Sequence, residues 1–322
     1  MILKGITQIS RIVVGGLFIF SGFVKLVDPI GSQYKFQEYF SEPVLDIEFL
    51  IPYALLFAIV LIVSEILLGV MILIGYKPKF TVWSLFVISI IFLFLTWYSA
   101  FYDKVTDCGC FGDAIKLTPW ETFYKNVILI ALIIILLIKI KFIKPIFKGK
   151  TPKLITFLSL AAFLCIVQHV LTHLPLIDFR AYAIGKNLQE GMQYPKDGTI
   201  PPVHDFMLED RQQDLAPELL EEDKVMLVIL YNLNTSDAKG FPAIKDVSEK
   251  AIKKGYTVYG VSASFSDDLL LAKEKYNLPF EFLFCDETTL KTMIRANPGV
   301  LVLDKGTVMQ KKSWVDVDEI EL

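Results

Sequence analysis

The sequence predicts a helical membrane domain followed by an α/β domain in water, and three observations support this fold class. Of the 322 residues, 54% are hydrophobic, which is more than a soluble domain usually carries. The excess is confined to residues 1–174, whereas the chain from about residue 178 onward has an ordinary soluble composition. That second part alternates β-branched apolar runs with amphipathic stretches. One membrane domain and one water-exposed domain are therefore expected.

Five apolar segments of the first part are long enough to span a bilayer, which takes about 20 residues of helix. Arg11 and Lys25 lie near the two ends of the first segment, where long side chains can reach the headgroups. No small-residue cleavage site follows this segment, so we expect it to remain as the first span. The predicted spans are residues 5–27, 50–75, 80–101, 120–140 and 154–174.

The segments that connect the spans alternate between basic and acidic. Lysine and arginine dominate before the first span, between the second and third, and after the fourth, where residues 139–153 hold six lysines. Because loops rich in lysine and arginine stay in the cytoplasm, we expect a cytoplasmic N-terminus. The loop after the third span and the C-terminal domain then lie outside. In a bacterium this means the inner membrane and the periplasm, an oxidising compartment.

The loop after the third span reads Asp-Cys-Gly-Cys-Phe-Gly-Asp over residues 107–113. Gly109 permits a turn tight enough for the sulfurs of Cys108 and Cys110 to approach. A disulfide closed over one residue is strained and prone to exchange, so the pair is a candidate redox site. A structural disulfide and half of a metal site are the alternatives, although no further Cys or His lies in the loop. Asp107 and Asp113 would disfavour a thiolate by repulsion, which suits a pair that stays oxidised or that another group activates.

Ionisable residues also occur inside the predicted spans. Glu65 lies in the middle of the second span, where such a residue suggests function by default. It can pair with Lys25, and a neutral, hydrogen-bonded glutamic acid is the alternative. His169 and His173 stand four residues apart on the last span and share one helix face. They are interpreted as a proton relay or a metal or quinone contact, or else as polar residues at the headgroup level. Cys165 lies in the middle of the last span and is expected to fill space as a small apolar residue.

The remaining chain predicts an extended connector over residues 178–218 and an α/β layered domain over residues 219–322. The order is β-α-β-α-β-α-β-β, with a hairpin turn at residues 305–306 between the last two strands. The predicted strands are residues 225–231, 257–262, 280–284, 300–304 and 308–311, and the predicted helices are residues 237–253, 267–276 and 288–294.

This order, with Pro298 just before the hairpin, resembles the thioredoxin fold, and especially the thiol-disulfide oxidoreductases and peroxiredoxin-like proteins of the bacterial envelope. Those proteins carry Cys-x-x-Cys where the first strand meets the next helix. Here residues 232–237 read Asn-Leu-Asn-Thr-Ser-Asp and hold neither cysteine. The resemblance implies that Asn297 and Pro298 form a peptide-binding edge around a cis-proline, so the degenerate domain can bind without reacting. The lone Cys285 is expected to be structural.

Arg11 and the glycine-containing run of residues 15–26, then Glu65 and Gly69, and finally the Cys-Gly-Cys loop form a second pattern. In these residues the membrane part resembles the DoxX-like superfamily, and within it the MauE type found in Bacteroidetes. The resemblance covers about residues 5–140. It implies a four-helix membrane domain over residues 1–150, with residues 151–177 as a fifth transmembrane helix.

The same resemblance implies a role for the loop cysteines. Cys108 and Cys110 would be the exchanging pair in disulfide formation in exported proteins, with electrons passed to quinone. Glu65, Lys25, Arg11, Asp107 and Asp113 are the candidate supporting residues, as they are charged and belong to the matching segments. The residues themselves establish no cofactor.

Two functions therefore stand open. The first is an inner-membrane thiol-disulfide redox protein that acts on envelope proteins or on a thiol redox partner through Cys108 and Cys110. The second is a membrane-anchored adaptor or assembly factor whose thioredoxin-like domain binds a client or an envelope complex without chemistry. A net charge of −3 gives no reason to expect nucleic acid as a partner. No metal site is expected, and the lipid bilayer is the partner that composition requires.

Overall fold

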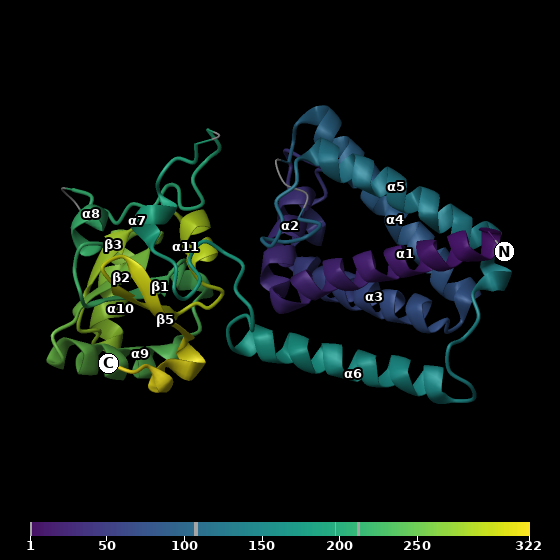
Figure 1. The fold of residues 1–322 in the computed structure, drawn as a ribbon. Helices are drawn as coiled ribbons and strands as arrows, with labels where there is room; N and C mark the ends of the chain where they lie inside the picture. The colour runs from purple at the N-terminus through teal and green to yellow at the C-terminus, as the bar shows by residue number, and fades with distance from the viewer. Residues whose placement is uncertain (1, 106–108, 197, 211–212) are drawn as a thin grey trace. The chain divides into compact units, whose positions relative to one another are not determined.

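The structure, a computed structural model, describes residues 2–105, 109–196, 198–210 and 213–322. It divides into two compact units, Met1–Leu171 and Thr172–Leu322. Each unit is described by itself (Figure 1).

The first unit has five helices that are long and apolar enough to span a membrane within the described ranges, as predicted. Four of them share one core, which includes Val14, Ile72, Leu85 and Ile133. The fifth packs against the first and second through Val167 and is otherwise largely exposed. The helices are α1 (Ile2–Val27), α3 (Ala54–Ile74, extended at its start by the 3-10 turn η1, Glu48–Tyr53), α4 (Pro78–Tyr102), α5 (Pro119–Ile138) and α6 (Thr151–Thr172).

Local sequence signals explain where these helices begin and end. Thr118 accepts from the backbone N–H of Glu121, whose side chain accepts in return from Thr118, and this capping box starts α5. Proline follows at the first helical position, where its missing N–H costs nothing. Gly75 ends α3 in the left-handed region, with φ 73°.

A further helix, α2 (Pro29–Phe40), was not among the predicted elements. Its start is well marked, because the Asp28 side chain accepts from the backbone N–H of Gly31 and Pro29 occupies the first turn. It is too short and too polar to span a membrane, and its Tyr39 and Phe40 pack with Val105. This helix covers the end of the bundle where the Cys-Gly-Cys loop lies.

Helices α1 and α3 approach closely because glycines line their contact. A Cβ placed on Gly22 would lie 2.9 Å from the backbone nitrogen of Ile66, and one on Gly69 would lie 3.0 Å from the carbonyl oxygen of Gly15. Small residues allow this backbone contact between membrane helices. It brings the polar residues of the two helices within hydrogen-bonding reach.

The second unit is built on one five-stranded sheet in the order β3-β2-β1-β4-β5. Strands β1 to β3 are parallel, β4 runs antiparallel to β1, and β5 runs antiparallel to β4. Every residue of β1 is buried, as expected for a central strand covered on both faces. The order confirms the predicted α/β domain, which resembles thioredoxin-like folds. The strands are β1 (Val225–Leu230), β2 (Thr257–Ser262), β3 (Glu281–Phe284), β4 (Gly299–Asp304) and β5 (Thr307–Ser313), and the main helices are α9 (Phe241–Lys253), α10 (Ser266–Tyr276) and α11 (Glu287–Met293).

Two ends in this unit differ from the prediction. Helix α9 begins at Phe241 and not at residue 237, because the 3-10 turn Ala238–Gly240, capped by Asp237, precedes it and Pro242 occupies its first turn. Strand β5 runs on to Ser313 and is followed by the 3-10 turn η5 (Trp314–Glu319). The described residues after β5 contain this 3-10 turn and no α-helix.

Residues 178–218 pack onto the sheet of this unit. Leu188, Phe206 and Leu208 are buried in the same core as β1 and β4. The backbone N–H of Gly185 donates to Val308 and that of Leu188 donates to Gly306, at 2.7 and 2.8 Å. The segment contains the short helices α7 (Leu188–Gly191) and α8 (Ala216–Leu219). It therefore contributes core residues to the unit in addition to connecting it.

A buried ionic cluster attaches the start of this segment to the sheet. Arg180 donates to both carboxylate oxygens of Asp178, at 2.7 and 2.8 Å, and Lys311 of β5 donates to the same carboxylate at 2.7 Å. Lys311 also donates to the carbonyl of Tyr182. Burial alone would raise the pKa of Asp178, but the two cations lower it from 3.8 to about 2.

We expect this cluster to make the stability of the second unit sensitive to acid. Because the pKa of Asp178 is lower in the folded chain, its contribution is complete above the ordinary value of 3.8 and is lost as pH falls toward about 2. Asp178→Asn should remove this pH dependence and lower the free energy of unfolding by roughly 3 kcal/mol, since two buried cations lose their anion. Acid titration of the full chain in detergent, followed by Trp314 fluorescence with the other tryptophans replaced by Phe, measures it. Asp318→Asn, at an exposed position, is the control, and an equal effect there would contradict the assignment.

Candidate functional site

From Gly109 onward, the Cys-Gly-Cys loop folds back onto the membrane unit. Asp107 and Cys108 lie outside the described residues. Gly109 and Gly112 have φ of 66° and 49°, which other residues adopt with difficulty. A Cβ on Gly109 would lie 3.0 Å from Cγ of Lys35, so α2 contacts the loop directly. Cys110 itself is buried, with 8% of its surface exposed.

A chain of polar side chains lies directly under Cys110. The hydroxyl of Ser21 donates to the carbonyl oxygen of Cys110 at 2.8 Å and accepts from Nζ of Lys25 at 3.0 Å. Lys25 also donates to both carboxylate oxygens of Glu65, at 2.9 and 2.8 Å. The predicted pairing of Lys25 with Glu65 is therefore confirmed. It links α1, α3 and the loop backbone in one network.

The Lys25–Glu65 pair is almost fully buried, with 6% and 1% of the side chains exposed. A single buried charge would be very unfavourable in this environment, whereas a well-bonded pair is tolerated. Both carboxylate oxygens face one ammonium, which is the geometry of an ion pair. The ring of Phe92, whose centroid is 5.2 Å from Nζ, gives Lys25 a further favourable contact.

Two small cavities meet at Cys110. One, of about 50 Å³, is lined by Lys25, Lys35, Phe92 and Cys110 among others. The other, of about 20 Å³, lies on the far side of the cysteine between Ser21 and Lys125. Each has room for water, which needs roughly 10–15 Å³. Small polar species can thus be accommodated beside Cys110.

Two more lysines surround the loop, and sequence reasoning missed both of them. Lys125 of α5 places Nζ 4.3 Å from the centroid of the Phe111 ring. Lys35 of α2 pairs with Glu38 at 2.8 Å and lines the larger cavity. Their positions follow from helix packing and have no local signal. Ser21 could have been found, since it stands four residues before Lys25 and so shares its helix face.

Arg11 is not brought to this site. Its guanidinium donates to the carbonyls of Ile72 and Leu73 at 2.7 and 2.6 Å, and to that of Lys144 at 3.3 Å. It therefore satisfies the free carbonyls at the end of α3, where a cation also suits the helix dipole. Lys25 lies 14 residues further along α1, which is about 21 Å at 1.5 Å per residue. Asp113, the other supporting candidate in the described loop, is exposed.

The two histidines belong to different units. His173 lies in the second unit, where its Nδ1 is 2.7 Å from a carboxylate oxygen of Asp316. His169 is an exposed residue of α6, as is Cys165. Among the described residues, no group of three or more His, Cys, Asp or Glu could hold a metal ion. A role of the histidines in proton transfer or quinone contact stays a prediction.

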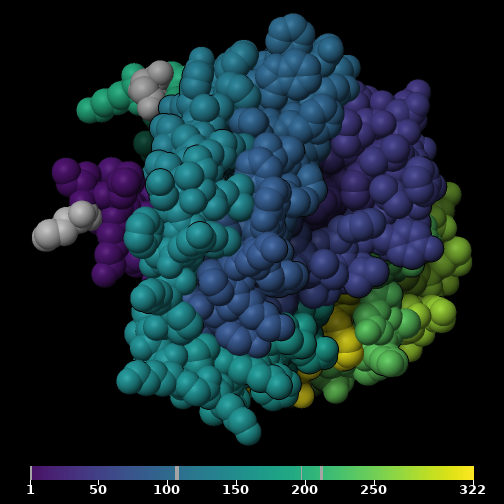
Figure 2. All heavy atoms as spheres, turned by 90° about the vertical axis from the view of Figure 1, so that its right-hand side faces the viewer, coloured from purple at the N-terminus to yellow at the C-terminus, as the bar shows by residue number. Residues whose placement is uncertain are grey.

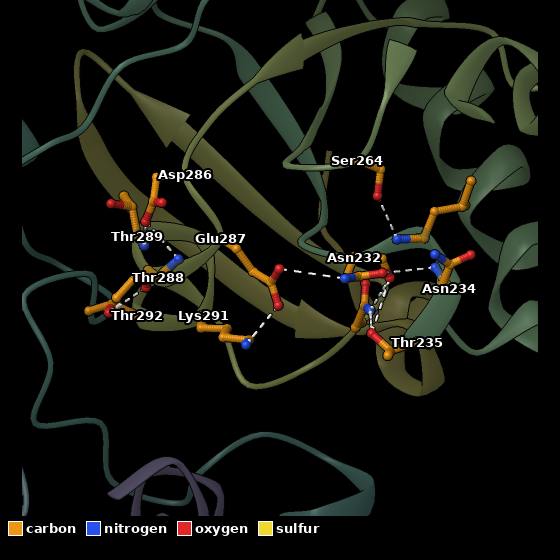
Figure 3. Close-up of polar contacts among 12 residues, drawn as sticks. Asn232, Asn234, Thr235, Ser264, Asp286, Glu287, Thr288, Thr289, Lys291 and Thr292 are labelled. Carbon is orange, nitrogen blue, oxygen red and sulfur yellow. Dashed lines mark hydrogen bonds and ion pairs between the residues drawn. The ribbon is translucent and has the colours of Figure 1, made fainter. Parts of the chain in front are cut away.

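In the second unit, the loop after β1 is closed by its own hydrogen bonds. The Asn297–Pro298 bond is cis, as the thioredoxin resemblance implies. The Asn297 amide donates to the carbonyl of Asn232 at 2.8 Å and accepts from the hydroxyl of Ser236 at 2.8 Å. Figure 3 shows Asn232 of this loop beside Glu287 of α11. The side-chain nitrogen of Asn232 lies 3.5 Å from a carboxylate oxygen of Glu287. The polar groups beside the cis-proline are thus occupied within the domain.

Cys285 follows β3 and is buried in the core of the second unit. Burial raises the pKa of its thiol to about 12, so it is a thiol at neutral pH. This agrees with the structural role expected of it. The second unit thus offers no reactive thiolate in the part of the chain that the structure describes.

Comparison with known proteins identifies the membrane part. Residues 3–139 match the family model of the methylamine utilisation protein MauE, which confirms the predicted resemblance of that region. No curated protein matches the chain. The solution structure of a thiol:disulfide interchange protein from Bacteroides sp. is 17% identical, with 33% of this chain and 74% of that chain covered and a TM-score of 0.27. The crystal structure of a thioredoxin-like protein from Bacteroides caccae is 14% identical, with 83% and 81% covered and a TM-score of 0.29.

Proposed function

We propose, on the premise that residues 3–139 form a MauE-type membrane region, that this chain is a thiol-disulfide redox protein of the bacterial inner membrane. Cys108 and Cys110 are its exchanging pair, and envelope proteins are its partners. The observation that carries the proposal is the polar network of Ser21, Lys25 and Glu65, which ends on the backbone of Cys110. Burying an ion pair costs desolvation free energy. A network with this cost that reaches the loop backbone through Ser21 favours a function of the loop.

The exchange itself needs only the pair and its surroundings. A thiolate of the partner attacks the Cys108–Cys110 disulfide, so that one S–S bond breaks and a mixed disulfide forms. The second partner thiolate then displaces the chain's sulfur, which leaves the partner oxidised and the pair reduced by two electrons. Lys25 and Lys35 line the cavity beside Cys110, and each is paired there with a glutamate, Glu65 and Glu38.

The quinone implied by the resemblance does not fit the cavities at Cys110. A cavity that takes a benzene ring measures about 150 Å³, whereas the larger cavity here is about 50 Å³. The reduced pair is reoxidised by a small disulfide such as glutathione disulfide, whose own S–S bond breaks to give two thiols as the Cys108–Cys110 bond forms.

Disulfide transfer from the purified full chain tests the proposal. The oxidised chain in lipid vesicles, mixed with a reduced peptide that holds two cysteines, should form one peptide disulfide for each chain. Adding a quinone in one sample and glutathione disulfide in another should show which acceptor sustains further turnover. Failure of the oxidised chain to transfer even one disulfide would refute the function; failure of quinone alone would refute only that acceptor.

A second function, as an adaptor, is favoured by the closed loop of the second unit. Residues 232–237 carry no cysteine, and the carbonyl of Asn232 and the hydroxyls of Thr235 and Ser236 are bonded to Asn297. This unit would then hold a client while the membrane unit reacts, or would act alone. A partner that still co-purifies with the full chain after both Cys108 and Cys110 are changed to Ser would support the adaptor; loss of that partner would argue against it.

A further inference from the structure

A long apolar groove lies between α3 and α4, away from the Cys-Gly-Cys loop. Its volume is about 1000 Å³, and Leu67 and Met71 of α3 face Trp83 and Val87 of α4 across it. Val87 and Trp83 are about half exposed, so the groove opens on the side of the bundle. Figure 2 looks onto the end of the membrane unit that carries the N-terminus and shows the blue of α4 beside the purple-blue of the chain before it.

The dimensions of the groove suit one leaflet of a bilayer. Its lining on α4 extends from Pro78 to Ile88, which is about 15 Å at 1.5 Å per residue. The hydrocarbon core is about 30 Å thick, so one leaflet contributes about half of that. An acyl chain that lies along α4 would thus be covered over most of its length.

Positive charge is concentrated at one end of the groove. Lys77 and Lys79 line that end, where α3 turns into α4, and both are exposed. The N-terminus of α4 starts at Pro78, and the partial positive charge of a helix start adds to that of the lysines. No acidic residue is among the described residues that line the groove. An anion is therefore favoured at this end, whereas the rest of the groove favours an apolar chain.

We propose that this groove binds an anionic phospholipid, with one acyl chain against Leu67, Met71 and Val87 and the phosphate at Lys77 and Lys79. A zwitterionic phospholipid offers the same chain with no net charge, so it binds less well. A lysine near an anionic surface raises the association constant by about five-fold. Lys77 and Lys79 therefore give the groove its preference for an anionic over a zwitterionic phospholipid. The proposal does not depend on the thiol chemistry of the other end.

Trp83 provides the measurement, because it lines the groove. The full chain with its other tryptophans changed to Phe is mixed, in detergent, with phosphatidylglycerol or phosphatidylcholine whose acyl chains carry bromine, which quenches tryptophan. We expect half-maximal quenching at a several-fold lower concentration of phosphatidylglycerol. Lys77→Gln with Lys79→Gln should reduce this preference by at least about five-fold. The matched control is Lys139→Gln with Lys141→Gln, two lysines outside the groove lining, which should keep it.

Two outcomes would overturn the proposal. One is equal quenching by both lipids in the unchanged chain, or a preference that survives loss of Lys77 and Lys79. The other is a quinone that quenches Trp83 at lower concentration than either lipid, which would give the groove to a different occupant. Ser84→Phe narrows the groove without adding a tryptophan and should weaken quenching of Trp83 by both lipids; a variant that is still quenched normally would place the lipid elsewhere.

Discussion

Replacing Cys110 by serine should reduce disulfide transfer by more than about 100-fold, because exchange needs both sulfurs of the pair. Cys110 is buried against Ser21 and the two cavities, so we expect partners to bond to Cys108. Cys110→Ser then leaves a Cys108 thiol that can join a partner but cannot release it. A mixed disulfide should accumulate with an oxidised peptide in this variant and not in Cys108→Ser.

The mixed disulfide is measured by the mass of the chain under non-reducing conditions, and transfer is measured by the peptide assay described above. Cys165→Ser is the matched control, since Cys165 is an exposed residue of α6. It should leave transfer and trapping unchanged. If Cys110→Ser transfers disulfides at the normal rate, the pair is not the redox site. If Cys108→Ser alone traps the partner, the order of attack is the reverse of the one expected.

Changing Lys25 to methionine should give the largest loss of stability. It leaves Glu65 buried at 1% exposure with no cation, and loss of one member of a buried pair costs about 3–5 kcal/mol. Removing both charges, as Lys25→Met with Glu65→Leu, should recover most of this, because no unpaired charge remains. Thermal unfolding of the full chain in detergent measures both variants. If the double variant is as unstable as Lys25→Met, the ion pair stabilises the fold by more than the mutual neutralisation of its two charges.

Ser21→Ala separates stability from redox chemistry. It leaves the Lys25–Glu65 pair in place and removes only the hydroxyl between Lys25 and the Cys110 carbonyl. We expect unfolding to change by about 1 kcal/mol, the net value of one hydrogen bond. The redox potential of the Cys108–Cys110 pair should shift, because the loop loses its link to the ammonium. An unchanged potential would make Ser21 a packing residue only. The double variant Lys25→Met with Glu65→Leu should also shift the redox potential of the Cys108–Cys110 pair.

Sequence reasoning succeeds where the physical signal is local. Runs of about 20 apolar residues predict the five spans to within three residues at most ends, and the all-buried strand β1 follows from an unbroken apolar run. Glu65 stands out by its depth in a span, and Lys25 is the nearest opposite charge. Pro298 is expected to be cis by resemblance, and it is.

What the sequence could not predict depends on distant parts of the chain. Arg11 is charged and lies in a matching segment, yet only packing shows that it ends α3 and does not support the loop. Lys35 and Lys125 belong to helices that are more than 70 residues apart in the sequence, and both line cavities at Cys110. No single motif could therefore predict that they meet there. Helix α2 has a polar sequence without a continuous apolar run, so hydropathy does not predict it.

The glycines between α1 and α3 have a consequence for the redox loop. Gly22 follows Ser21, and Gly69 lies one turn after Glu65, so the two polar residues stand beside points where backbone meets backbone. Side chains can change rotamer and absorb a small displacement, but two backbones in contact cannot. The distance across the ion pair is therefore set by a rigid spacer. A movement of α1 away from α3 would stretch the hydrogen bond from the Ser21 hydroxyl to the carbonyl of Cys110, so the position of this loop carbonyl depends on the spacing of the two helices.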